Sequence, residues 1–172
     1  MSRARKVGLA LLAAGGCLLI GLASGHRAPL LLFNTTRSAP LGFYWLTPGR
    51  FSRGQLVAVA PPVELARWMA TRHYLPINVP LLKEIVATEG QIVCGRGDGL
   101  SIDGVVVAHI RSHDRWGRAL PAFRGCRRLS AGQVFLLNRR APNSLDGRYF
   151  GPLPIERVIG GAHPLWTWER AS

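Results

Sequence analysis

The sequence contains very little lysine, cysteine or acid. Among 22 basic residues only Lys6 and Lys83 are lysines, and the chain has three cysteines and nine acidic residues. Three cysteines are too few for a disulfide-rich scaffold and lack the spacing of metal ligands, and the five histidines form no ligand pattern. We therefore expect neither a metal site nor a cofactor. With 48% hydrophobic and 18% charged residues, the composition also excludes a disordered, collagen-like or heptad-repeat chain.

Glycine and proline, in contrast, are abundant. Twenty glycines and twelve prolines favour turns and short strands over a helical bundle. The expected elements are a helix over residues 63–73, strands over 41–46, 56–60, 81–88 and 134–137, a hairpin turn at Asp103–Gly104 and a strand pair around Gly160–Gly161. The sequence thus predicts one mainly β, antiparallel domain over residues 28–172.

Residues 1–27 have the composition of a membrane anchor. An uncharged run, residues 7–25, follows three basic residues and would span roughly 28 Å as a helix, close to the hydrocarbon thickness of a bilayer. The preceding basic residues predict a cytoplasmic N-terminus and a periplasmic domain on a single pass through the inner membrane. A cleaved signal segment is the alternative, because small residues cluster at 23–25. We expect the second apolar patch, residues 30–33, to rest at the membrane interface.

The net charge of +13 has two interpretations. An excess of arginine suits contact with nucleic acid or with an anionic membrane surface, but an arginine-rich coding bias would produce it as well. Lysine is more informative, because arginine keeps its proton at ordinary pH whereas a buried lysine can lose it. Lys83 is therefore the only side chain beyond the N-terminal segment that can act as an amine base.

Four short motifs follow one another along the chain. They are residues 36–41 (TRSAPL), 53–57 (RGQLV), 82–90 (LKEIVATEG) and 138–148 (NRRAPNSLDGR). Together they resemble the successive boxes of the bacterial type I signal peptidases, the serine–lysine membrane proteases. Gln55 stands where that family usually has aspartate, and residues 89–91 depart from its usual Gly-Asp pair. The resemblance implies a signal-peptidase-like antiparallel β domain behind one N-terminal transmembrane helix.

Finer detail is similar to one branch of this family. The pattern Ser-x-Pro-x-Gly-x-Tyr from Ser38 to Tyr44, with residues 74–76 (YLP) and 148–152 (RYFGP), resembles the TraF-type conjugative-transfer peptidases, which mature pilin precursors. The housekeeping enzyme usually has methionine after its serine, where this chain has Ala39. The resemblance implies that the substrate is an exported precursor protein, such as a conjugative pilin, met beside membrane lipid.

The resemblance also assigns catalytic roles. Ser38 would be the nucleophile and Lys83 its general base, since no histidine lies near any serine motif. An ammonium normally has a pKa near 10.4, so its surroundings must desolvate it strongly to leave a free amine at neutral pH. Leu82 and Ile85 are among the apolar neighbours that would do so. The Ser38 backbone N–H and the Thr36 hydroxyl would stabilise the oxyanion.

Other residues receive supporting roles from the same resemblance. Pro40 and Gly42 would hold the turn that carries the nucleophile, and Ser144 would orient the lysine. Asp146 and Arg148 match a paired carboxylate and guanidinium that brace the last segment, and Asp146 is expected to support catalysis itself. Glu84 should point to the opposite strand face from Lys83 and so leave its protonation alone.

Two of the cysteines lie in the part that we predict to be exported. Cys94 and Cys126 bracket the expected hairpin, in a compartment where oxidation is favoured. We expect a disulfide between them, although the sequence alone does not establish it.

Three functions remain in competition. The preferred one is a membrane-anchored serine endopeptidase that matures a conjugative pilin, with hydrolysis or with cyclisation by the precursor's own amine. The alternative within the class is a general signal peptidase. The alternative from another class is a non-catalytic basic envelope protein that binds nucleic acid or lipid in a DNA-transfer apparatus. The solitary Lys83 favours the enzyme, because a surface that binds phosphate would not require a lysine at that one position. We therefore do not expect nucleic acid to be a partner.

Overall fold

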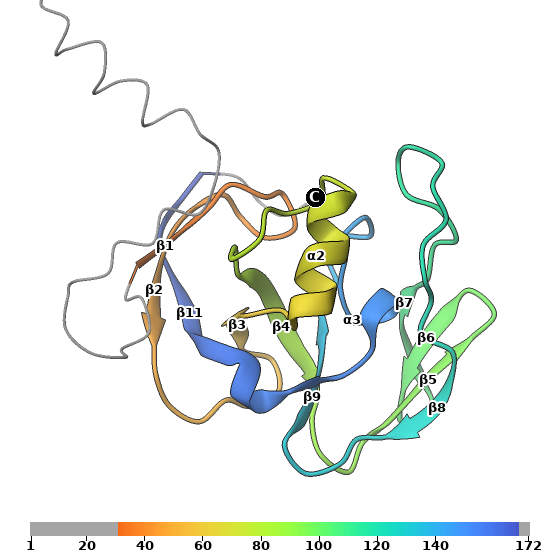
Figure 1. Cartoon of the computed structure of the whole chain (residues 1–172). Helices are drawn as coiled ribbons and strands as arrows, with labels where there is room; N and C mark the ends of the chain where they lie inside the picture. Colours follow the sequence, from red (N-terminus) through yellow and green to blue (C-terminus); the bar gives the residue numbers. More distant parts are fainter. Residues whose placement is uncertain (1–30, 169–172) are drawn as a thin grey trace, which may run out of the picture.

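The computed structural model describes residues 31–168, which form two antiparallel β-sheets (Figure 1). The expected anchor, residues 1–27, lies outside the described residues. Within residues 31–168, no helix is both long and apolar enough to cross a membrane. The mainly β, antiparallel fold that the sequence predicts is confirmed.

The larger sheet has seven strands in the order β1-β2-β11-β3-β4-β9-β10. Its strands are β1 (Leu31–Asn34), β2 (Gly42–Thr47), β3 (Leu56–Val59), β4 (Leu81–Ala87), β9 (Gln133–Leu137), β10 (Leu153–Pro154) and β11 (Val158–Thr167). The helix α2 (Val63–Thr71) connects β3 to β4, and the short helix α3 (Gly147–Phe150) with a 3₁₀ turn (Ile155–Arg157) follows β9. The central strand β4 is buried on both faces, which explains its nearly continuous apolar sequence.

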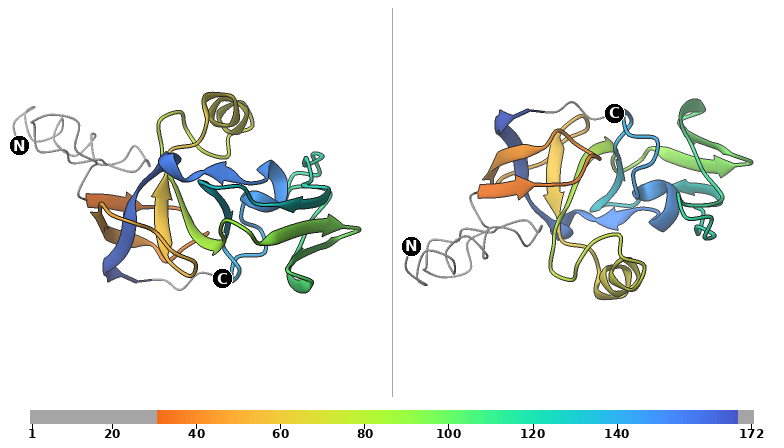
Figure 2. Two further views of the ribbon diagram at one scale, coloured as in Figure 1. Left: turned by 90° about the horizontal axis from the view of Figure 1, so that it is seen from below. Right: turned by 90° about the horizontal axis from the view of Figure 1, so that it is seen from above.

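The smaller sheet has four strands in the order β7-β6-β5-β8. They are β5 (Ile92–Arg96), β6 (Gly99–Ile102), β7 (Val105–His109) and β8 (Gly125–Arg128). Asp103 and Gly104 both have positive φ, 49° and 84°, as the two-residue hairpin between β6 and β7 requires. Figure 2 shows this sheet at the end of the molecule away from β1 and β2.

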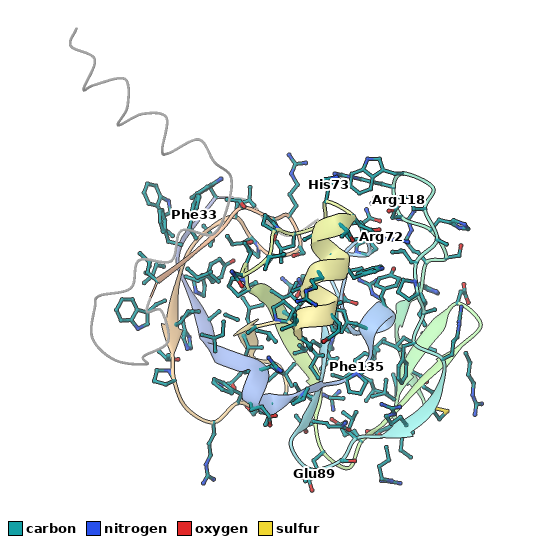
Figure 3. All side chains as sticks on the ribbon, viewed as in Figure 1. Phe33, Arg72, His73, Glu89, Arg118 and Phe135 are labelled. Atoms are coloured by element: carbon teal, nitrogen blue, oxygen red, sulfur yellow. A yellow bond between two sulfur atoms is a disulfide. The ribbon has the colours of Figure 1, made fainter. Side chains whose placement is uncertain are left out.

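Three apolar clusters hold these elements together. One joins the two sheets and includes Val93 and Leu100 from the smaller sheet and Phe135 from β9, which lies well inside the molecule in Figure 3. A second packs Met69 of α2 against β3, β4 and β9. The third lies under β1, β2 and β11 and includes Leu32. Burial of these side chains fixes β4 and β9 as the centre of the fold.

Two expectations about the ends of the larger sheet need correction. The patch at residues 30–33 was expected to rest at the membrane interface, but Leu32 is fully buried in β1 and pairs with Tyr44, whereas Phe33 remains partly exposed. The expected strand pair around Gly160–Gly161 is a single strand, β11, which pairs first with β3 and then with β2. Gly160 lies where β11 passes closely over β2, since an added Cβ would be 3.1 Å from the Thr47 carbonyl oxygen. These glycines therefore permit a close strand crossing and do not form a turn.

The structure contains the disulfide expected between Cys94 and Cys126. The two residues lie directly opposite each other on β5 and β8, and their sulfur atoms are 2.07 Å apart. Every residue of β8 is exposed, so this strand gains little from apolar burial. The disulfide therefore joins an edge strand to the sheet.

Replacing both cysteines, as Cys94→Ser/Cys126→Ser, should lower the free energy of unfolding by about 3 kcal/mol. The bond closes a loop of 32 residues and so restricts the unfolded chain. Urea unfolding in non-reducing buffer measures this change. Reductant should bring the wild type to the variant's stability and leave the variant itself unaffected. Equal stability of the two proteins without reductant would contradict the prediction.

Candidate active site

The loop between β1 and β2 is held in shape by one buried amide. The Asn34 side-chain nitrogen donates to the backbone carbonyls of Thr36, Ala39 and Pro40 at 2.9, 3.1 and 3.0 Å. Its oxygen accepts from the Thr36 backbone N–H and hydroxyl. The Tyr44 hydroxyl adds a bond of 2.6 Å to the Pro40 carbonyl oxygen. Sequence reasoning gave Asn34 no role, although an asparagine just before a turn-forming segment is a signal for such bonds.

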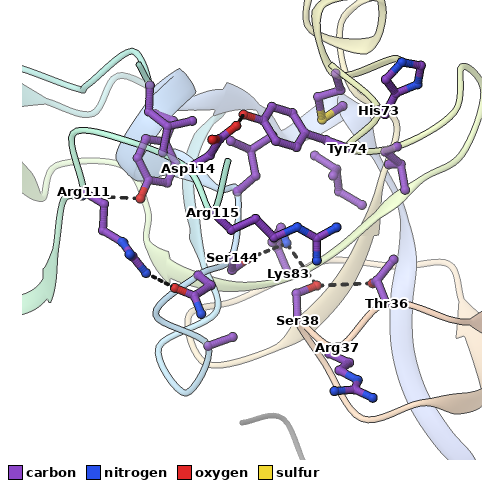
Figure 4. Close-up of a pocket in the computed structure, with 18 of the residues that line it drawn as sticks. Thr36, Arg37, Ser38, His73, Tyr74, Lys83, Arg111, Asp114, Arg115 and Ser144 are labelled. Atoms are coloured by element: carbon purple, nitrogen blue, oxygen red, sulfur yellow. Dashed lines mark hydrogen bonds between the residues drawn. The ribbon is translucent and has the colours of Figure 1, made fainter. Parts of the chain in front are cut away.

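This loop presents Ser38 to the amine of Lys83 (Figure 4). The Lys83 Nζ atom donates to the Ser144 hydroxyl at 2.8 Å and lies 3.4 Å from the Ser38 Oγ atom. The Thr36 and Ser38 hydroxyl oxygens are 3.3 Å apart. Four side chains that the sequence singled out therefore meet, from β4 and from the loops after β1 and β9.

The Lys83 side chain is only 3% exposed, although it carries an amine. Burial lowers its pKa from 10.5 to about 8, opposed by the nearby charge of Asp146 and assisted by that of Arg148. About one tenth of the molecules would then carry a neutral amine at pH 7. Glu84 does not disturb this, because it points away and forms an ion pair with Arg139 at 3.3 Å.

Asp146 and Arg148 form a buried ion pair behind the site. The Arg148 Nε atom lies 2.8 Å from the Asp146 Oδ1 atom, and the side chains are 3% and 0% exposed. The guanidinium also donates to the carbonyls of Ala141 and Ser144, each at 3.0 Å. The hydrogen bonds described for the Asp146 side chain come from Arg148 and from the backbone of Asn138, not from Ser38 or Lys83. Asp146 therefore braces the loop that carries Ser144.

Pro40 and Gly42 also lie where the expected turn is formed. The Pro40 carbonyl accepts the two bonds already described, from Asn34 and Tyr44. Gly42 has a φ of 138°, and a Cβ atom there would lie 2.0 Å from the Trp166 carbonyl oxygen. Only glycine therefore fits this entry to β2.

A cavity of about 470 Å³ opens above the Ser38–Lys83 contact. Its walls come from the nucleophile loop, from the C-terminal end of α2 with Tyr74, and from the loop at residues 111–120. Residues 31–168 contain no group of three or more side chains suited to bind a metal. The lining of the cavity includes two hydroxyl groups on one loop, Thr36 and Ser38, a third hydroxyl, Ser144, and the Lys83 amine, which are groups of the kind that a nucleophile, a base and hydrogen-bond donors require.

Known proteins match nearly the whole chain in sequence. The family described as "Signal peptidase, peptidase S26" matches residues 12–168. A conjugal transfer protein TraF of Agrobacterium fabrum is 34% identical over 96% of this chain and 96% of its own. A plasmid transfer protein TraF of Escherichia coli is 29% identical, over 98% and 100%.

A solved signal peptidase I from Enterococcus faecalis is 20% identical, with a TM-score of 0.41, and is matched over 67% of this chain and 98% of its own. The family match spans far more than half of the chain, and the TraF proteins are matched from end to end. This chain therefore belongs to the S26 family of signal peptidases, as a member of its TraF type.

Proposed function

We propose that this protein is a serine endopeptidase in which Ser38 is the nucleophile and Lys83 the general base. The observation that carries the proposal is the buried Lys83 amine, with its pKa near 8, placed 3.4 Å from the Ser38 hydroxyl. Burying an amine lowers the stability of a fold, and amines whose pKa is shifted in this way are concentrated at functional sites. Membership of a peptidase family supports the same conclusion.

The reaction begins when neutral Lys83 takes the proton of the Ser38 hydroxyl as its oxygen attacks the scissile carbonyl. Ser144, 2.8 Å from Nζ, holds the amine toward the nucleophile. The bond between carbonyl carbon and nitrogen then breaks, the lysine returns its proton to the departing amine, and an acyl-enzyme remains. A water molecule deprotonated by Lys83 releases the acyl group, and the proton passes back to Ser38.

The tetrahedral intermediate carries a negative oxygen that needs donors placed in advance. The Ser38 backbone N–H is one donor, and the Thr36 hydroxyl is the second. That hydroxyl donates to Asn34 at 2.8 Å in the free enzyme, so it would turn its proton toward the oxyanion when substrate binds. Each such donor is typically worth about 3 kcal/mol in the transition state.

The substrate that we propose is the pilin precursor of a conjugation system. The names of the relatives, plasmid and conjugal transfer proteins, support this branch over a general signal peptidase. Either water or the precursor's own N-terminal amine could resolve the acyl-enzyme. The mass of the product distinguishes the two, because a cyclic product is lighter than the hydrolysed one by one water.

An exposed aromatic surface supports a position at the membrane. It consists of the exposed Trp45, Trp166 and Trp168 and the partly buried Phe33 and Phe43, on β1, on β2 and at and just after the end of β11. The Phe33 ring lies 4.7 Å from that of Phe43 and 5.9 Å from that of Trp168. Figure 3 labels Phe33 at the outer edge of the fold.

The aromatic surface is continuous with the nucleophile loop, because the Trp168 backbone N–H donates to the Leu41 carbonyl. Tryptophan rings favour the interface between lipid and water. We place the aromatic surface at the periplasmic face of the inner membrane, with residues 1–27 as the anchor and residues 28–172 as the catalytic domain.

Replacing Ser38 with alanine or Lys83 with arginine should reduce precursor processing by at least about 10³-fold. The first change removes the nucleophilic oxygen, and the second replaces the base with a side chain that keeps its proton. Processing of the pilin precursor by purified full-length protein, followed by mass spectrometry, measures the effect. Ser52→Ala, an exposed serine away from the site, is the matched control. Undiminished processing by a folded Ser38→Ala or Lys83→Arg variant would refute the assignment.

The buried amine should also appear in the pH dependence of stability. The pKa of Lys83 is lowered in the folded state, so between pH 8 and 10.5 the unfolded chain binds the extra proton, and stability rises with pH. Over this range the wild type should gain about 3 kcal/mol relative to Lys83→Met. Urea unfolding of both proteins at each pH measures the difference, in which the titration of shared groups cancels. Parallel stability curves would contradict a buried, neutralised amine.

Contact of the aromatic surface with lipid can be tested by tryptophan quenching. A Trp68→Phe/Trp116→Phe variant keeps the three tryptophans of the aromatic surface, whereas Trp45→Phe/Trp166→Phe/Trp168→Phe keeps only the other two. In vesicles containing brominated lipid, the first variant should be quenched strongly and the second only weakly. Equal quenching of the two variants would contradict the orientation.

A further inference from the structure

The charged side chains that line the cavity above Ser38 and Lys83 are mainly cations. Arg37, Arg111 and Arg115 contribute to its walls, and all three are exposed. Asp114 is the only acidic residue among those that line it. A cleft with one sign of charge concentrates ligands of the opposite sign.

The single acid, Asp114, is already neutralised within its own loop. Its carboxylate accepts from Arg118 Nε at 2.7 Å, from the Tyr74 hydroxyl at 2.5 Å and from the backbone N–H groups of Trp116 and Arg118. Burial acts to raise its pKa, but these hydrogen bonds outweigh burial and hold the pKa well below its ordinary value. Asp114 is therefore a fixed structural anion, and the charge presented to a substrate is positive.

Further hydrogen bonds tie the loop at residues 111–120 to the end of α2. The Arg118 guanidinium donates to the Arg72 carbonyl at 3.0 Å, and the Arg72 guanidinium donates to the Ala119 carbonyl at 2.8 Å. Figure 3 shows Arg72 and Arg118 as neighbours beside α2. The two walls of the cavity are thus joined, which gives the loop a fixed position above the site.

Arg115 projects from this anchored loop into the cavity. Its guanidinium carbon lies 4.0 Å from the centre of the Trp116 ring, and Figure 4 shows the side chain reaching over Lys83 and Ser38. Stacking on an aromatic ring orients a guanidinium while its N–H edge stays free for a planar, two-oxygen acceptor. Arg111, on the same loop, donates to the Asn143 side chain and so flanks the cavity from the Ser144 side.

We propose that Arg115, assisted by Arg37 and Arg111, binds a carboxylate of the precursor next to the scissile bond, and that Asp114 positions this arginine. The inference rests on the proposed peptidase function and adds a substrate class to it. The carboxylate is either an aspartate or glutamate side chain or the free terminus of the precursor. A guanidinium fork suits both, because both offer two oxygens in a plane.

The first measurement locates the cut. Purified full-length enzyme is incubated with the pilin precursor, and mass spectrometry of the products identifies the scissile bond. A side-chain carboxylate or the chain terminus should lie within about three residues of that bond, on the length scale of an arginine side chain. A cut with no carboxylate within about three residues on either side would overturn the proposal.

The second measurement tests whether the two groups interact. Peptides that span the cut are compared with an Asp→Asn or Glu→Gln version and with a version whose C-terminus is amidated. With the wild type, kcat/KM should fall roughly tenfold to a hundredfold for whichever version removes the bound carboxylate. With Arg115→Gln, kcat/KM for the unaltered peptide should fall by a similar factor, and neutralising the peptide should have no further effect.

Matched variants separate recognition from general charge. Arg96→Gln removes an exposed arginine at the end of β5 and should leave kcat/KM unchanged. Arg115→Lys keeps the charge but loses the fork, and should fall between the wild type and Arg115→Gln. Asp114→Asn should weaken the preference for the acidic peptide as Arg115→Gln does, with Lys83-dependent cleavage of the neutral peptide retained.

The outcomes distinguish this inference from the function on which it rests. If the wild type cleaves no precursor, both proposals fall. A second outcome is that the wild type cleaves, but Arg115→Gln and neutralisation of the peptide lower kcat/KM by independent factors that multiply. In that case only the carboxylate site is refuted, and Ser38 and Lys83 keep their roles.

Discussion

The burial of one amine within a central β-strand is the constraint on which this site depends. Lys83 lies in β4, whose other residues are almost all apolar and buried. The Ser144 hydroxyl accepts a hydrogen bond from the amine, but this one bond does not replace the hydration that bulk water would give. The charged form therefore loses hydration that the fold does not replace, which favours the neutral amine. The same burial that prepares a base lowers the stability of the fold at neutral pH. An arginine here would stay charged and gain no reactivity, so the chain's scarcity of lysine makes this position informative.

A buried ion pair, formed by Arg148 and Asp146, holds in place the loop that brings Ser144 to the Lys83 amine. The segment between β9 and α3 must be irregular to bring Ser144 to Nζ, so its carbonyls have no strand or helix partner. Arg148 supplies the missing donors, with bonds to the carbonyls of Ala141, Pro142 and Ser144, and Asp146 balances its charge. No buried side-chain nitrogen or oxygen atom within residues 31–168 lacks a hydrogen-bond partner. Burying the ion pair costs free energy, and its structural effect is to fix the position of the loop that carries Ser144.

The sequence predicted the elements that have a strong local pattern. The apolar run of β4, the Asp103–Gly104 turn and helix α2 were all predicted near their observed positions, because periodicity and turn chemistry determine them. β8 was missed because its four exposed residues carry no apolar pattern, and its place depends on a partner 32 residues away. β11 was misread because a glycine pair permits either a turn or a close strand crossing, and only tertiary contact decides. The site residues were predicted from the order of their segments, whereas Asn34 was given no role, although an asparagine before a turn-forming segment is a general signal for bonds to the backbone.

The charges around the cavity and the protonation of Lys83 are linked by electrostatics. Positive charge near an amine favours its neutral form, as the charge of Arg148 does for Lys83, so a cavity with arginines can attract a carboxylate without opposing the base. A carboxylate left alone beside Nζ would do the opposite and favour the ammonium, which would inactivate the enzyme as substrate arrives. Pairing that carboxylate with an arginine that cannot lose its proton removes the conflict, because the pair brings little net charge to the site. In the proposed mechanism arginine and lysine therefore have different roles. The arginines keep their protons and bind the carboxylate, whereas Lys83 must be able to lose its proton to act as the base.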